Sequence, residues 1–345
     1  DADGKLKNAF VFISNLDSPQ KQLVISGNEK VVRPRLADAA FFYDLDRKKT
    51  LAEHALPLQK VVFQQQLGTV AEKCQRISAL AGVIAKQIGG DVALAEQAGS
   101  LCKADLTSDM VYEFDTMQGV MGYYLAKNEG LDIEVAEAMR EQYLPRFAGD
   151  NLPQTRTGMA VALADKLDTL VGIFGIGQKP SGDKDPYALR RATLGTLRII
   201  IEGELSLDLD AMIAHAATLF GDRIDAGCVA DVIEFVRGRY RAIYHDQGIQ
   251  TLVILSVAAV SPAQPLDFDR RVKAVAEFQQ RSEAASLAAA NKRVANILVK
   301  QSVPANAVVD PAKLVEAEEK TLHAAVVKVS AAIAPQVAAL NYASV

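Results

Sequence analysis

Residues 160–201 bring together the side chains whose types and spacing could do chemistry. The stretch reads AVALADKLDTLVGIFGIGQKPSGDKDPYALRRATLGTLRIII. Apolar residues at helical spacing surround Asp165, Lys166 and Asp168, and a glycine-rich connection follows. Arg190 and Arg191 lie one turn into the next helical pattern. The stretch therefore predicts two buried helices joined by a charged surface loop, the kind of segment in which binding and catalytic residues concentrate.

The connection matches a phosphate-binding loop only in part. Residues 177–184 read GQKPSGDK, close to the pattern of four residues between glycines followed by Gly-Lys-Ser/Thr. Asp183 intrudes between Gly182 and Lys184, and Asp185 stands where a hydroxyl residue is needed. Two carboxylates would repel a polyphosphate, so the sequence favours a plain helix–helix connection. Asp185 followed by proline predicts a capped helix over residues 186–204.

Residues 163–167, LADKL, resemble the last motif of the HD phosphohydrolase superfamily, whose helical domains hold a divalent metal with His, His-Asp and a final Asp. The chain has four histidines, and none lies between residues 55 and 214. The segment 91–110, which should present His-Asp, offers Cys102, Lys103 and Asp105 instead. A lysine ammonium repels a metal ion. We therefore expect the superfamily's fold without its metal site, with Asp165 as a vestigial motif position.

The elements that must position these residues are mostly helices, so the predicted fold class is mainly α. Residues 9–15 and 22–26 have the composition of short strands, and residues 1–30 are interpreted as the remnant of an upstream sheet-containing domain. An all-α domain is expected over residues 31–260. Its predicted helices are 35–47, 51–55, 71–88, 91–110, 134–142, 160–172, 186–204, 209–219, 228–246 and 250–257.

Two prolines within residues 261–265 predict a domain boundary. The start of a second, truncated helical domain is expected over residues 266–345. Helical patterns cover residues 267–299 and 314–340, with a kink or break at Pro335.

Composition narrows the protein class. The chain has 345 residues, of which 50% are hydrophobic, and a net charge of −4. This charge argues against a nucleic-acid binder that is basic throughout, although local basic patches remain compatible with it. We see no secretory leader and no apolar run of membrane-spanning length, and the three cysteines form no disulfide framework, so a cytoplasmic protein is expected. Both ends look like cuts in a longer polypeptide.

Two further sets of cations are candidates for binding anions. Arg33 and Arg35 flank Pro34, which would hold the guanidinium groups in fixed directions as a phosphate clamp; equally, they could pair with Glu29 and Asp38. In the last helical region basic residues outnumber acidic ones, which suits a nucleic-acid backbone or a plain solvated helix face. The basic residues singled out there are Arg270, Arg271, Lys292 and Arg293.

Several blocks, in order along nearly the whole chain, resemble one family, the β subunit of the bacterial two-subunit glycyl-tRNA synthetase. They begin with ISGNEKVVRPRLADAAFFYDLDRKKTL, VVFQQQLGTVAEK, KADLTSDMVYEF and QGVMG. They continue with QYLPRFAGDNLP, ALADKLDTLVGIFGIGQKPSGDKDPYALRRATLGTLRII, DFDRRVKAVAEF and AAANKRVANIL.

The resemblance implies an HD-like helical domain followed by the start of a helical anticodon-binding domain. It implies that a partner α subunit activates glycine with ATP and Mg, that the β subunit recognises tRNA(Gly), and that the two form a heterotetramer. On that basis this chain would carry no catalytic residue, metal or cofactor of its own, and would bind neither membrane nor DNA. The tRNA-binding candidates are Arg33, Arg35, Lys184, Arg190 and Arg191 for the acceptor side, and Arg270, Arg271, Lys292 and Arg293 for the anticodon side.

Two other functions stay open on the sequence. An active HD-type metal-dependent phosphohydrolase of nucleotides or RNA ends is one, and the missing histidines argue against it. A pure assembly scaffold is the other, in which the apolar surface of residues 160–201 only docks the α subunit.

Overall fold

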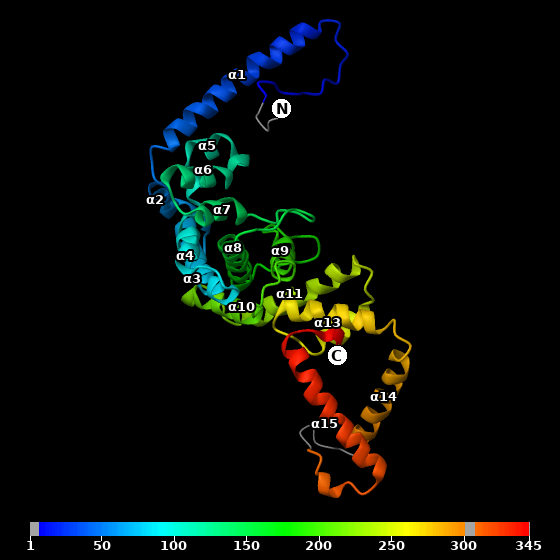
Figure 1. The fold of residues 1–345 in the computed structure, drawn as a ribbon. Helices are drawn as coiled ribbons and strands as arrows, with labels where there is room; N and C mark the ends of the chain where they lie inside the picture. Colours follow the sequence, from blue (N-terminus) through cyan, green and yellow to red (C-terminus); the bar gives the residue numbers. More distant parts are fainter. Residues whose placement is uncertain (1–6, 301–307, 345) are drawn as a thin grey trace.

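The computed structural model describes residues 7–300 and 308–344 and confirms the mainly α fold class (Figure 1). The first helices are α1 (Lys21–Asp46), α2 (Leu51–Ala55), α3 (Val70–Ile88), α4 (Val92–Leu101), α5 (Asp109–Glu113), α6 (Val120–Glu129), α7 (Ile133–Glu141) and α8 (Arg156–Gly175). They continue as α9 (Leu189–Glu202), α10 (Leu209–Thr218), α11 (Cys228–His245), α12 (Thr251–Ala258), α13 (Pro265–Phe278), α14 (Ala284–Lys300) and α15 (Ala317–Ala338). Strands β1 (Val62–Gln64) and β2 (Gly68–Thr69) form a small antiparallel pair.

Helix α8 is the centre of the body. It is apolar on nearly all sides, which is the pattern of a helix surrounded by other helices. It packs against α3, α4, α7, α9, α10 and α11. Gly172 and Gly175 let neighbours approach closely, since a Cβ at either position would collide with Phe220 or Ile224. The charged residues of α8 are therefore held in a rigid, largely buried setting.

Helices α3 and α4 pack closely against each other. A capping box fixes the start of α3, with Thr69 and Glu72 each accepting a backbone N–H of the other residue. Gly89 ends α3 in the left-handed conformation, with φ of 74°. Gly99 on α4 faces the backbone of Ser78 on α3, where a Cβ would lie 2.6 Å from the Ser78 Cα. This close approach sets the position of the residues that follow α4.

The two predicted N-terminal strands are wrong. Residues 22–26 lie in the first turns of α1, and residues 9–15 contain no strand. No neighbouring strand among the described residues pairs with them, so the backbone groups of residues 22–26 bond within a helix instead. Helix α1 also runs across residue 30, where the sequence suggested a boundary, and it contains Pro34. Residues 1–6 of the predicted remnant lie outside the described residues.

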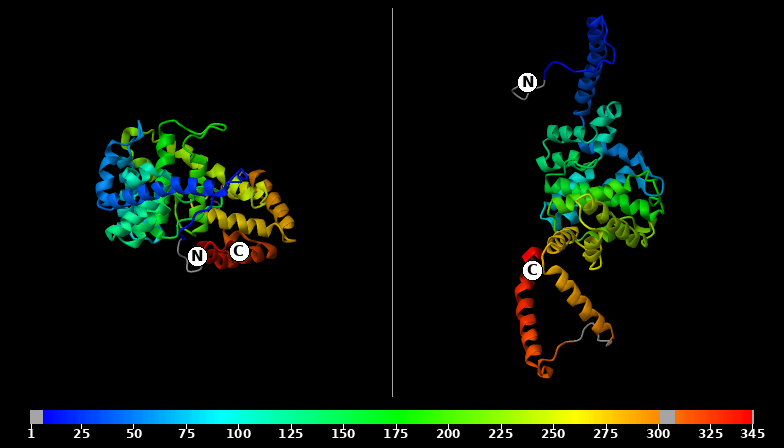
Figure 2. Two further views of the ribbon diagram at one scale, coloured as in Figure 1. Left: turned by 90° about the horizontal axis from the view of Figure 1, so that it is seen from above. Right: turned by 90° about the vertical axis from the view of Figure 1, so that its right-hand side faces the viewer.

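Helix α1 projects from the body and is attached at its C-terminal end (Figures 1 and 2). The buried carboxylate of Asp46 accepts the backbone N–H groups of Asp109 and Met110, each at 2.9 Å, and so caps α5. Apolar side chains such as Leu23, Val31 and Leu36 stay exposed along the projecting part. The helix is thus joined to the body over its C-terminal half, through Asp46 and through contacts with α5.

Two predicted helices have different bounds. The expected helix over residues 186–204 begins at Leu189, because Ala188 takes a left-handed conformation with φ of 53°. The carboxylate of Asp185 still caps it, accepting the N–H groups of Leu189 and Arg190 at 2.8 and 3.0 Å. The expected helix over residues 91–110 divides into α4, a 3₁₀ turn (Ala104–Thr107) and α5.

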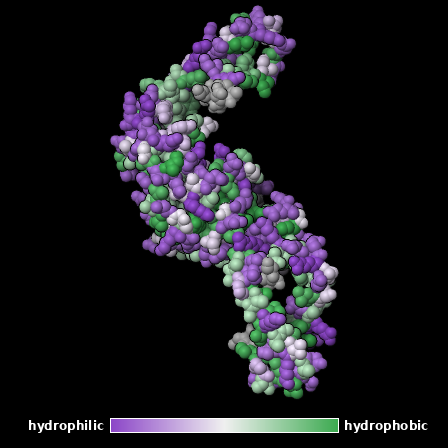
Figure 3. All heavy atoms as spheres, viewed as in Figure 1, coloured by the Kyte–Doolittle hydropathy of each residue, from purple (hydrophilic) through white to green (hydrophobic). Residues whose placement is uncertain are grey.

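At the other end, the long helical pattern over residues 267–299 divides into α13 and α14, and Pro335 lies inside α15 without ending it. Helix α13 packs on α9 and α12, whereas α14 and α15 project and have no buried residue among those described (Figure 2). Apolar residues are visible among polar ones at both projecting ends (Figure 3). By length and composition alone α15 could cross a membrane; a single such helix is weak evidence and does not indicate a membrane protein.

Candidate nucleic-acid interface

A buried cluster of opposite charges joins α8 to α3 and to the segment after α4. Each carboxylate oxygen of Asp165 is held by a different lysine: Lys73 Nζ lies 2.9 Å from Oδ1 and Lys103 Nζ lies 2.8 Å from Oδ2. Lys73 also donates to Asp168 at 3.0 Å. The three elements are thereby linked through two carboxylates and two ammonium groups in the middle of the body.

Arg76 completes the cluster from the next turn of α3. Its Nε lies 2.6 Å from Asp168 Oδ1, and its Nη2 lies 3.3 Å from Oδ2. The guanidinium also stacks on the Phe220 ring, with its Cζ 4.1 Å from the ring centroid. Planar, two-pronged contact of this kind is what arginine makes and lysine does not.

The charges in the cluster hold one another in the ionised form. Burial by itself would raise the pKa of Asp165, but attraction to Lys103 and Lys73 outweighs it and the pKa lies well below its usual range. Burial would likewise lower the pKa of Lys73 and Lys103, and Asp165 raises both above their usual value. Asp165 is thus a carboxylate whose two oxygens are already occupied by cations.

These residues do not fit a divalent metal. Both oxygens of Asp165 face ammonium groups, which would repel a metal ion at the same place. Over residues 7–300 and 308–344, no group of three or more His, Cys, Asp or Glu side chains is arranged to hold one. His54, the histidine nearest before the cluster in sequence, is buried and its Nε2 contacts the carbonyl of Asp46 at 3.0 Å.

An open cleft of about 1290 Å³ lies directly beside the cluster. Its walls come from the turn before α6, the segment between α7 and α8, and the facing sides of α8 and α9. The polar and aromatic side chains that line it include Thr116, Gln118, Arg140, Tyr143, Arg146, Asn151, Gln154, Asp165, Lys166, Thr169, Tyr187 and Arg191. The Asp165 ion cluster therefore borders the same space as the polar and cationic side chains of the cleft walls.

Two of the lining cations have no carboxylate partner within the described part of the chain. Lys166 is buried, and its Nζ donates to the carbonyls of Leu144 and Gln142 at 2.7 and 3.2 Å. Burial lowers the pKa of Lys166 to about 8. Arg191 is exposed, and its Nη1 donates to the carbonyl of Arg146 at 3.3 Å. Arg191 can take an anion without first giving up an ion pair. Lys166 adds positive charge beside the cleft, but its three N–H groups already donate to the carbonyls of Gln142, Leu144 and Ala162.

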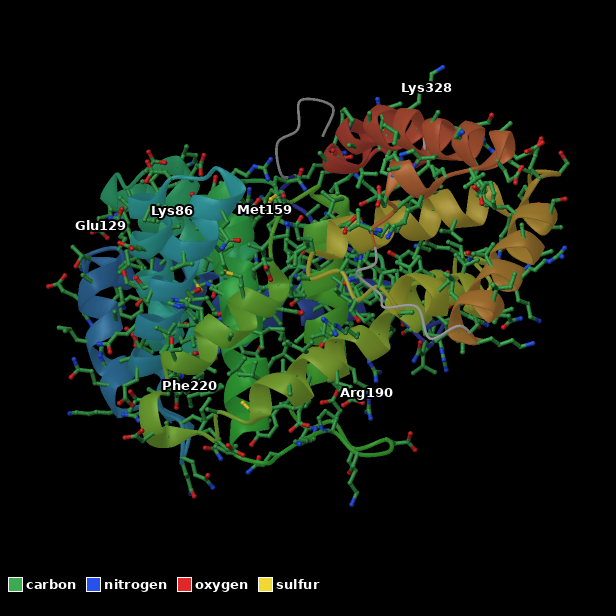
Figure 4. The ribbon with its side chains drawn as sticks, turned by 90° about the horizontal axis from the view of Figure 1, so that it is seen from below. Lys86, Glu129, Met159, Arg190, Phe220 and Lys328 are labelled. Atoms are coloured by element: carbon green, nitrogen blue, oxygen red, sulfur yellow. The ribbon has the colours of Figure 1, made fainter. Side chains whose placement is uncertain are left out.

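The predicted cations around the 176–188 connection have different surroundings. Of Lys184, Arg190 and Arg191, only Arg191 lines the cleft. The guanidinium of Arg190 donates to the carbonyl of Gly182 and so holds the connection against α9. Lys184 is exposed at the tip, where its backbone pairs with Ser181. In Figure 4 the Arg190 label lies just above the green loop at the lower edge of the view.

The cations of α1 lie away from the cleft and are paired. Arg33 forms an exposed ion pair with Glu29 at 3.7 Å, one of the two partners considered on the sequence. Arg35 pairs with Glu113 of α5 rather than with Asp38, and its Cζ lies 4.8 Å from the Phe114 ring centroid. Arg35 thus joins α1 to the body, whereas Arg33 pairs within α1, so the two arginines have different partners and do not act as one clamp around Pro34.

The C-terminal candidates are divided between two helices. On α13, Arg271 pairs with Asp267 at 2.9 Å, and Arg270 donates to the carbonyl of Ala339 at 3.4 Å. Lys292 and Arg293 are exposed on α14. The four candidates therefore lie on two helices, and the two on α13 already have partners in the chain.

Sequence reasoning singled out Asp165, Lys166 and Arg191 and noted Lys103 at the missing His-Asp position, but it did not identify Lys73 and Lys103 as the partners of Asp165. Lys166 and Tyr143 line the cleft together with Asp165 and Arg191, and Lys73 and Lys103 neutralise Asp165 from elements far away in sequence. A signal was present: charged residues embedded in an otherwise apolar, buried helical pattern need partners. The residues next to Asp165 in the sequence do not show which distant residues those partners are.

Comparison with known proteins gives one consistent result. A family model described as "Glycyl-tRNA synthetase beta subunit" matches residues 1–259. A glycine–tRNA ligase beta subunit of Pseudoalteromonas translucida is 54% identical over 343 residues, covering 99% of this chain and 50% of the relative. Those of Salmonella typhi and Pseudomonas fluorescens are 55% and 52% identical, covering 92% and 99% of this chain and 46% and 50% of the relatives. The chain spans about half the length of the curated relatives it matches.

Proposed function

Because this chain belongs to the glycyl-tRNA synthetase β-subunit family, we propose that it forms part of the tRNA-recognition subunit of a glycine–tRNA ligase. In this proposal it binds tRNA(Gly) in the cytoplasm and positions it for glycylation at the active site of a partner α subunit. ATP and Mg act at the partner, and this chain contributes no catalytic residue, metal or cofactor. The single observation in the structure that most favours binding over hydrolysis is the capture of Asp165 by Lys73 and Lys103.

Positioning is a sufficient contribution to catalysis. Holding two reactants in a productive geometry can remove several kcal/mol, roughly 7 to 11 in favourable cases, from a barrier. Phosphate contacts of Arg and Lys fix the register of a nucleic acid, and unpaired bases stack on aromatic rings. The cleft offers both kinds of group, in Arg191, Lys166 and Tyr187.

The decisive experiment is a fluorescence-anisotropy titration of the 345-residue chain with tRNA(Gly) and with a non-cognate tRNA at two salt concentrations. We expect tighter, salt-dependent binding of tRNA(Gly), because recognition elements lie in this chain. Equal binding of both tRNAs would place the discrimination elsewhere. Absence of binding to either would contradict the proposal and favour the scaffold function, for which the α subunit should then bind without tRNA.

The hydrolase alternative has its own test. Purified chain is analysed for metals by inductively coupled plasma mass spectrometry. The proposal predicts no stoichiometric manganese, iron or zinc, because the two lysines at Asp165 repel a cation. A stoichiometric metal would revive the phosphohydrolase.

A further inference from the structure

Tyr143 is the first sign that the cleft has a ligand of its own. The residue lines the cleft, and its ring lies 4.2 Å from Lys103 Nζ. Its hydroxyl is buried and has no hydrogen-bond partner in the described part of the chain. Leaving such a group unpaired costs roughly 1–3 kcal/mol. Because Tyr143 forms part of the cleft wall, a ligand in the cleft is a candidate partner for this buried hydroxyl.

The charge of the cleft indicates an anion. Lys166 and Arg191 lack carboxylate partners among the described residues, as shown above. Asp165, which faces the same space, is neutralised by Lys73 and Lys103 from behind. Glu141, another lining acid, is used internally, accepting the N–H groups of Gln154 and Thr155. Asp115 is an exposed acid at the cleft edge before α6. Around Asp165 and along α9, positive charge without a carboxylate partner exceeds negative charge without a cationic partner.

Size and wall chemistry indicate nucleotides, and more than one. The cleft holds about 1290 Å³, more than the roughly 300–1,000 Å³ of a pocket for one small molecule. Gln118, Asn151 and Gln154 offer amides that both donate and accept, as base edges require. Tyr187 offers a half-buried aromatic ring. An A-form RNA duplex keeps most of its base edges in a deep, narrow major groove that side chains cannot read, whereas unpaired nucleotides present theirs freely.

We propose that this cleft binds a short unpaired segment of RNA without a metal ion, with a phosphate at Arg191 in the positive field of Lys166, a base against Tyr187 and a polar ligand atom at the Tyr143 hydroxyl. The proposal rests on the tRNA-binding function above and adds a place and a form of RNA to it. Lys73 and Lys103 fix the position of the Asp165 side chain, so this part of the cleft is preformed.

The test uses the whole 345-residue chain and a fluorescein-labelled single-stranded RNA tetranucleotide, titrated by fluorescence anisotropy. Tyr143→Phe removes only the hydroxyl and should weaken binding about fivefold, the equivalent of one hydrogen bond. Arg191→Glu reverses an exposed charge and should weaken it more than about tenfold. The matched control is Lys86→Glu, an exposed cation on α3 that does not line the cleft and lies well apart from Arg190 in Figure 4; its affinity should stay within about twofold of the wild type.

Thermal unfolding followed by circular dichroism separates binding from folding, and Tyr143→Phe should unfold no earlier than the wild type. The inference is overturned if the tetranucleotide does not bind, if both cleft variants bind it as the wild type does, or if AMP alone competes as well as the tetranucleotide. If tRNA still binds in any of those cases, only the inference about the cleft is overturned and the proposed function remains supported. Loss of tRNA binding as well would remove both.

Discussion

At the scale of single residues, Asp165 shows how a charge can be accommodated in a largely buried site by partners from other elements. Its two oxygens are shared between Lys73 and Lys103, so neither the carboxylate nor the ammonium groups is buried alone. Such an arrangement need not stabilise a fold relative to an apolar core, but removal of one partner leaves unmatched charge behind.

Asp165→Asn should therefore lower the free energy of unfolding by about 3 kcal/mol, because two buried lysines lose their common counter-charge. Urea unfolding followed by circular dichroism measures it. Asp183→Asn, at an exposed position in the connection between α8 and α9, is the control and should change stability by less than about 0.5 kcal/mol. Equal stability of the two variants would show that the lysines are compensated by other groups.

Lys166 should produce an alkaline pH dependence of stability. Its pKa is about 8 in the folded chain and near 10.4 for an unperturbed lysine, so between these values the unfolded chain binds more protons. The Lys166 contribution to stability is therefore constant below pH 8 and increases as pH rises towards 10.4. Lys166→Met lacks this gain, so the wild type should gain about 3 kcal/mol over the variant across that range.

Urea unfolding of both proteins at pH 7, 8, 9 and 10 measures this difference directly, and titrations common to both proteins cancel. If the stability difference between the two proteins does not change over these pH values, folding does not lower the pKa of Lys166. The Lys86→Met variant, at an exposed lysine, should show no such trend.

At the scale of elements, the contact between α3 and α4 is limited by backbone rather than by side chains. A methyl group on Gly99 would lie 2.6 Å from the Cα and 2.9 Å from the backbone N of Ser78, atoms that cannot rotate away. Gly99→Ala should therefore lower the free energy of unfolding by about 2 kcal/mol, through overpacking. Denaturant unfolding provides the value.

Gly238→Ala is the matched control for that substitution. Gly238 lies inside α11, and a Cβ there meets nothing within 4 Å. Because alanine has the higher helix propensity, this variant should gain up to about 1 kcal/mol. We expect the free energy of unfolding to fall for Gly99→Ala and to rise for Gly238→Ala. A destabilising Gly238→Ala would contradict the packing of α11 described above.

Periodicity predicted elements well where one helix face is buried. The expected helix over residues 51–55 has the bounds of α2, and that over residues 71–88 differs from α3 by one residue. The strand predicted over residues 22–26 is wrong, because β-branched and aliphatic side chains favour a strand only where a neighbouring strand exists. The predicted start of α9 is wrong because the Asp185 carboxylate accepts the N–H groups four and five residues further along the chain. The simple capping pattern assumes an N–H group only two or three residues away.

The site was less predictable than the helices. Asp165 and Arg191 could be singled out from their own surroundings in sequence. Lys103 and Lys73, which decide the chemistry of Asp165, lie 62 and 92 residues away from it, and only the packing of α3 and α4 on α8 brings them near. A single sequence contains no information on such pairings beyond the need for some partner.

At the scale of the whole molecule, local charge matters more than net charge. The chain carries a net charge of −4, yet Lys166 and Arg191 leave unpaired positive charge at the cleft. We therefore expect tRNA affinity to fall steeply between roughly 50 and 200 mM salt despite the negative total. Arg191→Glu should reduce the slope of log affinity against log salt by about 1 or more. An unchanged slope would place the phosphate contacts on other surfaces.

The Asp165 cluster has a further consequence for how the protein is made. The lysines that complete the centre of the body are synthesised with the rest of the chain, so the ion cluster can close as soon as α3, the segment after α4, and α8 meet. Nothing has to be delivered from solution to the Asp165 cluster. A bacterium starved of zinc, manganese or iron would thus keep its yield of this folded body, and growth in a chelator should leave the soluble amount of the protein unchanged.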